Sequence, residues 1–352
     1  MIKFYIEVMG LIKINKSKRL DLTFEEIIDN IKDADTNISM IAREDIVSSE
    51  TDEKLKEFYK EFGLDDYEVL ISHKAITEMP FNKYIDLSFL ERNDTYKPYT
   101  IHHLRYEPTD YPIKNRELKS YVPLIRFDES ITLPMICEDS IGWMTPVLFE
   151  ETTMREAVNK AHGHVLVVGL GIGFYPFNCL LKDEVKKITI IEYNEKIIEL
   201  FKEFILPQFP RANDIEIIHG DAFEYLNNDY IKQFYYTFVD IWRNDSDGTV
   251  ILSDVYKKLD FSEPLNIDFW IEDNILHNVQ SSLFIYIWHV YKGTIKNYIK
   301  GEISTSREVE NFITFDKIHN YFKKKSIAIN NRNDLLDVIN DKALLRDMLK
   351  SF

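Results

Sequence analysis

Three glycines at alternate positions, Gly169, Gly171 and Gly173, follow directly after the apolar run 165–168. Glycine in a compact turn adopts backbone conformations that other residues avoid, and it lets another group come close to the main chain. A helix-like segment comes next, so the backbone N–H groups of the turn would stand at a helix start, where polar or anionic ligands bind. The pattern predicts a turn that holds a ligand.

Acidic residues stand at the ends of the next three apolar runs. Glu192 ends KITIIE, Asp221 follows IEIIH, and Asp240 ends YTFVD. In an open parallel sheet, ligands bind beyond the carboxyl ends of the strands, where the strand order reverses. Each residue also has a structural interpretation: Glu192 and Asp221 as solvated residues at strand ends, and Asp240 as a helix N-cap. Their joint spacing favours a shared ligand site.

The elements that would position these residues alternate between helix and strand. Helices are expected at 153–161, 177–181, 195–204 and 222–226, and strands at 165–168, 187–192, 215–219 and 237–240. The strands are continuously apolar, as expected for a parallel sheet that is covered on both faces. The sequence therefore predicts an α/β fold with a doubly wound, mostly parallel sheet.

The rest of the chain predicts two additions to this core. We expect an N-terminal α+β accessory domain over 1–145, the core over 146–260, and a mainly helical C-terminal extension over 261–352. In the first part, helices are expected near 23–31 and 51–63, and a loop-rich segment or small antiparallel sheet over 93–134. In the last part, a short strand is expected at 326–329 and a helix at 333–349.

Composition limits the class of protein. The chain has 352 residues, two cysteines (Cys137 and Cys179) and a formal charge of −16. Nucleic-acid binding needs a basic surface, and a membrane span needs about 18 apolar residues in a row. We therefore expect a soluble cytoplasmic protein with neither nucleic acid nor membrane as partner, and leave self-association open. His102, His103, His162 and His164 lack the neighbours of a metal site, so no metal is expected.

The core resembles the class I S-adenosylmethionine-dependent methyltransferases over about residues 150–256. Their first motif is a hydrophobic strand that ends in G-x-G-x-G, as in VLVVGLGIG here. The resemblance implies that Glu192 binds the ribose hydroxyls, Asp221 the adenine amino group and the Ala222 amide a ring nitrogen. The implied S-adenosylmethionine-binding set is Gly169, Leu170, Gly171, Gly173, Glu192, Tyr193, Asp221, Ala222 and Asp240.

Within that superfamily the chain is most similar to the spermidine-synthase-like branch. VLVVGLGIG, GDAFEYL and FVDIWRNDSD fall where that branch has its glycine motif, its G-D-A/G unit and its catalytic D-S-S-D-P. Two departures stand out: Ile172 replaces an acidic residue that holds the donor amine, and D-I-W-R replaces D-S-S-D. In that branch the segment before the core caps the cofactor, which would place Trp143, Met144 and Thr145 near the acceptor.

The expected function is methyl transfer from S-adenosylmethionine to a small-molecule acceptor. Asp240 is the candidate catalytic residue, orienting or partly deprotonating the nucleophile, whereas Asp245 and Asp247 are expected to be turn and cap residues. The alternatives are an aminopropyltransferase and a non-catalytic nucleoside-binding protein. A nicotinamide-dependent oxidoreductase fits less well, because Phe174 stands where G-x-G-x-x-G needs its third glycine.

Overall fold

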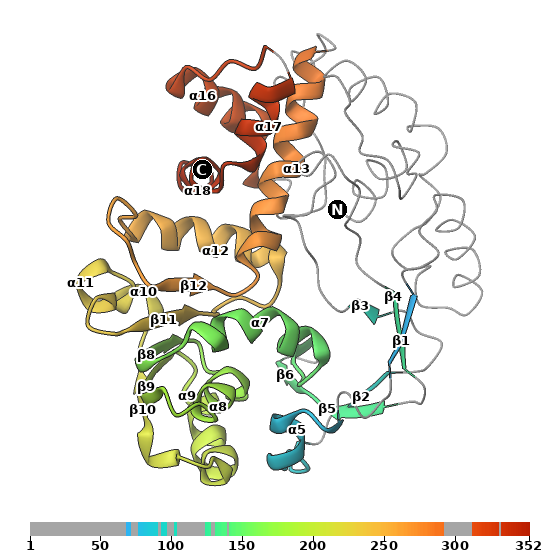
Figure 1. Cartoon of the computed structure of the whole chain (residues 1–352), viewed down its shortest axis with the longest axis vertical. Helices are drawn as coiled ribbons and strands as arrows, with labels where there is room; N and C mark the ends of the chain where they lie inside the picture. The colour runs from blue at the N-terminus through green and yellow to red at the C-terminus, as the bar shows by residue number, and fades with distance from the viewer. Residues whose placement is uncertain are drawn as a thin grey trace.

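The computed structural model describes residues 68–71, 77–90, 93–96, 102–103, 124–127, 131–138, 141–291, 312–330 and 332–352 (Figure 1). The helices expected at 23–31 and 51–63 lie outside the described residues. The statements below refer to the described part of the chain.

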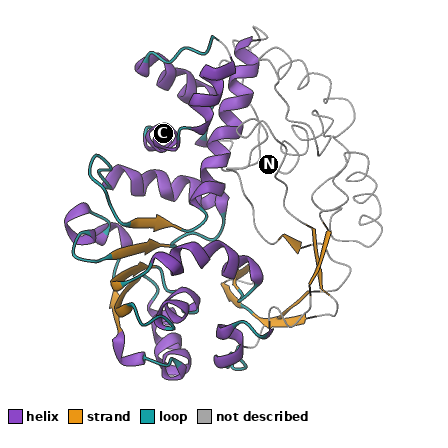
Figure 2. Ribbon diagram, in the orientation of Figure 1, coloured by secondary structure: helices purple, strands orange, loops and turns teal. Residues whose placement is uncertain are grey.

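The centre of the structure is a five-stranded parallel sheet in the order β10-β9-β8-β11-β12 (Figure 2). Its strands are β8 (Gly163–Val168), β9 (Val185–Glu192), β10 (Ile215–His219), β11 (Tyr236–Val239) and β12 (Ile267–Phe269). The chain runs outward from β8 to β10 and then returns to β11 on the other side of β8. The strand order therefore reverses at β8, which confirms the predicted doubly wound sheet.

Strands β8 and β11 are continuously apolar because both faces of the sheet are covered there. Val165, Leu166 and Val168 in β8 and Phe238 and Val239 in β11 are at most 1% exposed. The registers pair Val168 with Ile191 and with Val239, so the three strands end at the same level. This alignment brings the residues that follow each strand together at one edge of the sheet.

Helices surround the sheet, and several differ in extent from the prediction. They are α7 (Leu148–Lys160), α8 (Phe174–Leu180), α9 (Glu195–Leu200), α10 (Ala222–Tyr225), α11 (Asn228–Ile231) and α12 (Asp245–Lys258). Helix α7 begins five residues before the expected start, and α11 was not expected. The chain continues from α9 through a π-helical turn, Phe201–Ile205, and a 3-10 turn, Leu206–Gln208.

The described part of the N-terminal region consists of short strands and one helix. They are β1 (Glu68–Ile71), α5 (Pro80–Tyr84), β2 (Asn93–Tyr96), β3 (His102–His103), β4 (Leu124–Phe127), β5 (Ile131–Pro134), β6 (Ile136–Glu138) and β7 (Ile141–Met144). The pairs β2–β5, β3–β4 and β6–β7 are antiparallel, whereas β1–β4 is a parallel pair that was not expected. Phe81 of α5 is fully buried against Phe174 and Phe177 of α8, which attaches this helix to the core.

The C-terminal region is helical, as expected, with two corrections. Its helices are α13 (Glu272–Tyr291), α16 (Phe315–Lys325), α17 (Arg332–Asn340) and α18 (Lys342–Lys350). The predicted strand at 326–329 is wrong: Ser326 takes a left-handed conformation (φ 54°) that ends α16, and an irregular segment follows. The predicted helix 333–349 is two helices, because the Asp341 side chain accepts the Leu344 N–H and starts α18.

A buried ion-pair network attaches α18 to the core. Glu272, only 7% exposed at the start of α13, accepts hydrogen bonds from Arg346 at 2.7 and 2.8 Å and from the Tyr256 hydroxyl. Lys342 lies 2.7 Å from the same carboxylate. Burial raises the pKa of Glu272, but Lys342 and Arg346 outweigh it, so the net pKa is lowered. The carboxylate is thus ionised and fully paired.

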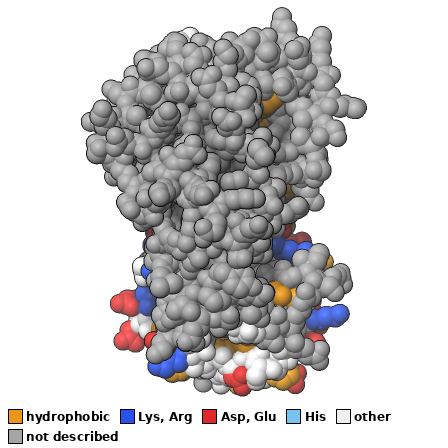
Figure 3. Space-filling view, turned by 90° about the vertical axis from the view of Figure 1, so that its right-hand side faces the viewer, with side chains coloured by type: hydrophobic (Ala, Val, Ile, Leu, Met, Phe, Trp, Pro, Cys, Tyr) orange, Lys and Arg blue, Asp and Glu red, His pale blue; other side chains and the backbone are white. Residues whose placement is uncertain are grey.

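The described surface carries charges of both signs. On the face in Figure 3, acidic and basic side chains lie next to one another at the lower end. Within the described ranges, every helix is too short or too polar to cross a lipid bilayer.

Candidate functional site

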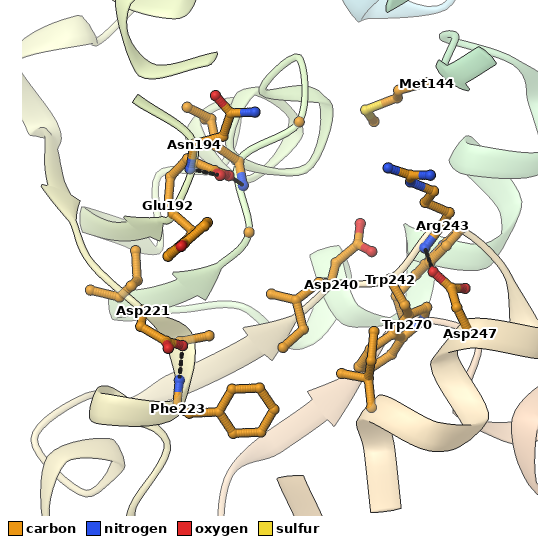
Figure 4. Close-up of a pocket in the computed structure, with 18 of the residues that line it drawn as sticks. Met144, Glu192, Asn194, Asp221, Phe223, Asp240, Trp242, Arg243, Asp247 and Trp270 are labelled. Atoms are coloured by element: carbon orange, nitrogen blue, oxygen red, sulfur yellow. Dashed lines mark hydrogen bonds between the residues drawn. The ribbon is translucent and has the colours of Figure 1, made fainter. Parts of the chain in front are cut away.

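A cavity of 470 Å³ opens at the carboxyl ends of β8, β9, β10 and β11, where the strand order reverses (Figure 4). Eight of the nine predicted cofactor-binding residues line it: Gly169, Leu170, Gly171, Glu192, Tyr193, Asp221, Ala222 and Asp240. Figure 4 shows Glu192 and Asp221 on one side of the cavity and Asp240, Arg243 and Trp270 on the other. The cavity therefore has two distinct ends.

The first two glycines stand at close contacts of the turn after β8. A Cβ on Gly169 (φ 101°) would lie 1.8 Å from the Asp240 carbonyl oxygen, so this glycine lets β8 and β11 end side by side. A Cβ on Gly171 (φ 54°) would lie 2.5 Å from the Met144 sulfur. The Ile172 N–H also points at that sulfur, 3.4 Å away. Gly169 thus serves the packing of the strands, and Gly171 faces the cavity.

The third glycine, Gly173, does not reach the cavity. It is the left-handed N-cap of α8 (φ 78°), and a Cβ there would lie 2.3 Å from the Phe201 ring and 3.1 Å from Phe209. Its place in the pattern reflects helix packing. Among the described residues that line the cavity, the glycine turn is represented by Gly169, Leu170 and Gly171.

Glu192 connects two of the turns that form the cavity. Its carboxylate accepts the Leu170 N–H at 2.9 Å and the Asn194 N–H at 2.7 Å. Asn194 in turn caps α9 by accepting from Lys196 and Ile197. Glu192 is only 7% exposed, so these bonds offset the cost of burying its charge. Each carboxylate oxygen can still accept a second hydrogen bond from a ligand.

Asp221 and Ala222 stand at the start of α10. One carboxylate oxygen of Asp221 accepts the Phe223 N–H at 2.9 Å, so the side chain is a helix N-cap as well as a cavity residue. Phe223 contributes an aromatic ring to the same end (Figure 4). Tyr193 is 74% exposed at the rim, and its carbonyl oxygen lies 3.0 Å from the His219 ring. This end combines carboxylates with an aromatic wall.

Asp240 follows β11 at the opposite end. Burial raises its pKa well above the usual value, and the carboxylates of Glu150, Glu192 and Asp247 raise the pKa further. Asp247, not Asp240, holds the start of α12, since its side chain accepts the N–H groups of Arg243 and Asn244 at 3.0 and 2.9 Å. The cap role expected for Asp247 is therefore observed, and Asp240 faces the cavity.

Glu150 is a cavity residue that the sequence reasoning missed. It lies in the first turn of α7, and burial raises its pKa to about 8. The expected helix began at residue 153, so Glu150 fell in the preceding loop, and the sequence did not predict which way its side chain faces. Two acidic residues after Val147 were the available signal, because acidic side chains favour the first turn of a helix.

At the end of the cavity that contains Asp240, the aromatic side chains are those of Trp242 and Trp270. The Trp270 indole N–H donates to Thr153 of α7 at 3.0 Å, which fixes the ring. Trp242 is 4% exposed, and its indole nitrogen has no hydrogen-bond partner among the described residues. Of the segment expected to cap the cofactor, Met144 lines the cavity, whereas the Thr145 hydroxyl donates to Pro134. The Trp143 side chain lies outside what the structure describes.

The histidines take part in local contacts. His164 lies 2.9 Å from the Thr189 hydroxyl, and His162 lies 2.8 Å from the Lys160 carbonyl oxygen. Within the described ranges, no three His, Cys, Asp or Glu side chains are grouped as metal ligands.

The chain was compared with protein families, curated proteins and solved structures. No protein-family model and no curated protein matches the chain. Among solved structures, the chain is similar to the spermidine synthase from Thermotoga maritima, with 16% identity and a TM-score of 0.30 over 46% of this chain and 60% of that one. It is also similar to TrmN from Thermus thermophilus, with 16% identity and a TM-score of 0.25 over 39% of this chain and 45% of that one.

The chain thus spans less than two thirds of either neighbour. With its parallel sheet, its strand order and its glycine turn after β8, the core has a Rossmann-like, doubly wound α/β fold, as predicted.

Proposed function

We propose that the chain binds S-adenosylmethionine in this cavity and transfers its methyl group to a small-molecule acceptor. The observation that carries the proposal is the position of Glu192 and Asp221 on one end of a single cavity and of Asp240 on the other. The volume of 470 Å³ is also within the range of about 300–1,000 Å³ that is usual for small-molecule sites.

The residues at the first end fit a nucleoside. Glu192 keeps acceptor capacity on both oxygens for a vicinal diol, although Leu170 and Asn194 already donate to it. One oxygen of Asp221 caps α10, which leaves the other for an exocyclic amine. The Gly171 N–H belongs to the part of the turn that faces the cavity, where the carboxylate of an amino acid would be favoured.

The residues at the second end would hold the acceptor. S-adenosylmethionine supplies, when bound, an electrophilic methyl carbon on its sulfonium. Asp240 would orient the acceptor and, in its ionised form, accept the proton that the nucleophile loses. Trp242 and Trp270 exclude water from this end, and exclusion with positioning accounts for much of the catalysis expected of such a reaction.

Aminopropyl transfer is the second candidate, because one observation favours it. Five carboxyl side chains line the cavity, from Glu150, Glu192, Asp221, Asp240 and Asp247. This charge suits a donor with an extra amine and no carboxylate. Ile172 opposes this candidate: it is 1% exposed and does not line the cavity, so the usual carboxylate for that amine is missing.

Calorimetry and a donor assay would test the proposal. We expect S-adenosylmethionine to bind with a micromolar dissociation constant, about −8 kcal/mol, and NADH not to bind. An assay with S-adenosylmethionine, its decarboxylated form and a metabolite extract should yield S-adenosylhomocysteine. Aminopropyl products instead would favour the second candidate. Binding without turnover, unchanged in Asp240→Asn, would favour a non-catalytic nucleoside-binding protein.

A further inference from the structure

The second end of the cavity contains more negative than positive groups. Glu150 comes from α7, Asp240 from the end of β11 and Asp247 from α12, and Glu192 of β9 faces them from the first end. Arg243 is the one basic residue among the described residues that line the cavity. The groups come from four separate elements that the fold holds in place, so the arrangement is a property of the cavity.

Carboxyl groups crowded in this way resist ionisation when the cavity is empty. Burial raises the pKa of Glu150 to about 8 and that of Asp240 well above its usual value, and the charge of Glu150 adds to the shift at Asp240. Asp247 and Glu192 act in the same direction on Asp240. Both groups therefore hold their protons to higher pH than a carboxyl group in water, so near neutral pH the ligand-free pair retains a proton.

We propose that Glu150 and Asp240 make the cavity prefer the positively charged sulfonium cofactor over its neutral thioether product, by releasing a proton when the sulfonium binds. This inference rests on the proposed function. A positive charge beside the pair stabilises the ionised carboxylates, so binding the sulfonium displaces the proton. The thioether carries no such charge and leaves the pair protonated.

The proton balance closes over one turnover. The bond from sulfur to the methyl carbon breaks, the nucleophile forms a bond to that carbon, and sulfur keeps the electron pair. A nucleophile that carries hydrogen then loses one proton, which the carboxylate pair takes up. The pair thereby returns to its protonated form as the sulfonium becomes a thioether, and the affinity for the product falls. Glu150 is in this account a specificity-determining residue.

Calorimetry from pH 6 to 8 tests the inference. For S-adenosylmethionine, the dissociation constant should fall as pH rises, by up to about tenfold per pH unit if one proton is released. For S-adenosylhomocysteine it should change much less. Repeating the titrations in buffers with different heats of ionisation counts the released protons directly and needs no variant. About one proton is expected with the sulfonium and none with the thioether.

Glu150→Gln should abolish most of the proton release and reduce the preference for the sulfonium several-fold at pH 8. The amino group of each ligand titrates identically against wild type and variant, so the difference between the two proteins isolates Glu150. Glu151→Gln is the matched control, because Glu151 is the next residue of α7 and pairs with Arg155 outside the cavity. It should behave as wild type.

The two possible failures are distinguishable. If neither ligand binds, the proposed function itself is wrong. If both bind with equal pH dependence, or if Glu150→Gln releases as many protons as wild type, the inference is overturned and cofactor binding stands.

Discussion

The carboxylate of Glu192 accepts the backbone N–H of Leu170 at 2.9 Å, across the gap between the β9–α9 and β8–α8 turns. Its other oxygen accepts the Asn194 N–H at 2.7 Å. One buried side chain thus fixes two turns of the cavity relative to each other. A residue expected to bind ligand is also part of the framework that shapes the site.

This double role predicts the behaviour of Glu192→Gln. The amide has one acceptor oxygen, so its NH₂ group must face the N–H of Leu170 or of Asn194. We expect the free energy of unfolding to fall by ~1–3 kcal/mol and nucleoside affinity to fall at least tenfold. Urea unfolding and calorimetry measure the two effects. Glu195→Gln, at an exposed position in the first turn of α9, should change neither; normal binding by Glu192→Gln would contradict the assignment.

The same substitution at two glycines of the turn should cost different amounts of stability. In Gly169→Ala the new methyl group would lie 1.8 Å from the Asp240 carbonyl oxygen, a backbone atom that cannot move aside. We expect a loss of at least ~2 kcal/mol of stability. In Gly171→Ala the methyl group meets the flexible Met144 side chain. We expect a loss of about 1 kcal/mol, from the left-handed backbone conformation alone.

Thermal unfolding compares the stability of the two variants, and calorimetry compares their binding. Gly171→Ala should keep the fold but bind more weakly, because its methyl group enters the cavity side of the turn. Equal destabilisation by both variants would show that the neighbours of Gly171 are as rigid as those of Gly169.

The sequence predicted the sheet and most of its edge because the signals there are local. A continuously apolar run predicts a buried strand, and the glycine or carboxylate that ends the run marks the residue at the edge of the sheet. Gly169 follows Val168 in this way, and Glu192 follows Ile191. The register of parallel strands then aligns these ends. Eight of the nine residues predicted to bind the cofactor therefore line the cavity, although the sequence could not assign them individual roles.

Residues brought in by less regular elements were harder to predict. Glu150 lines the cavity from the first turn of α7, and this helix begins at Leu148, five residues earlier than expected. Gly173 fits the glycine pattern, but the reason for it is the Phe201 ring, which comes from a distant part of the chain. The expected strand at 326–329 depended on four residues, which is too short a window to separate a strand from irregular chain.

The Glu272–Arg346 ion pair predicts a large cost for removing one partner. Arg346→Met leaves the Glu272 carboxylate, 7% exposed, with Lys342 and Tyr256 only. We expect a loss of ~3 kcal/mol in urea unfolding. The double variant Glu272→Gln/Arg346→Met should recover part of that loss, because no unpaired charge stays buried. Arg155→Met, at an exposed pair with Glu151, should cost less than ~0.5 kcal/mol.

The pH dependence of this pair has a definite sign. The pKa of Glu272 is lowered in the folded state, so its contribution is complete above the usual value of 4.5 and is lost as pH falls below it. Wild type should therefore lose stability on acidification more steeply than the double variant. Parallel acid unfolding curves would contradict the buried ion pair.

Glu150 predicts the opposite dependence on pH. Its pKa is raised from 4.5 to about 8, so the folded protein holds a proton that the unfolded chain has lost. Between these values the free energy of unfolding contributed by this group falls as pH rises. Glu150→Gln removes the free-energy cost of this buried titratable group. We expect it to stabilise the ligand-free protein by ~1–3 kcal/mol at pH 8, with little effect at pH 4. Urea unfolding at both pH values measures the difference, with Glu151→Gln as the control. If Glu150→Gln raises the stability of the protein but lowers its preference for the sulfonium over the thioether, Glu150 serves ligand binding and not stability. Equal effects on stability at pH 4 and pH 8 would instead show that Glu150 is an ordinary surface residue.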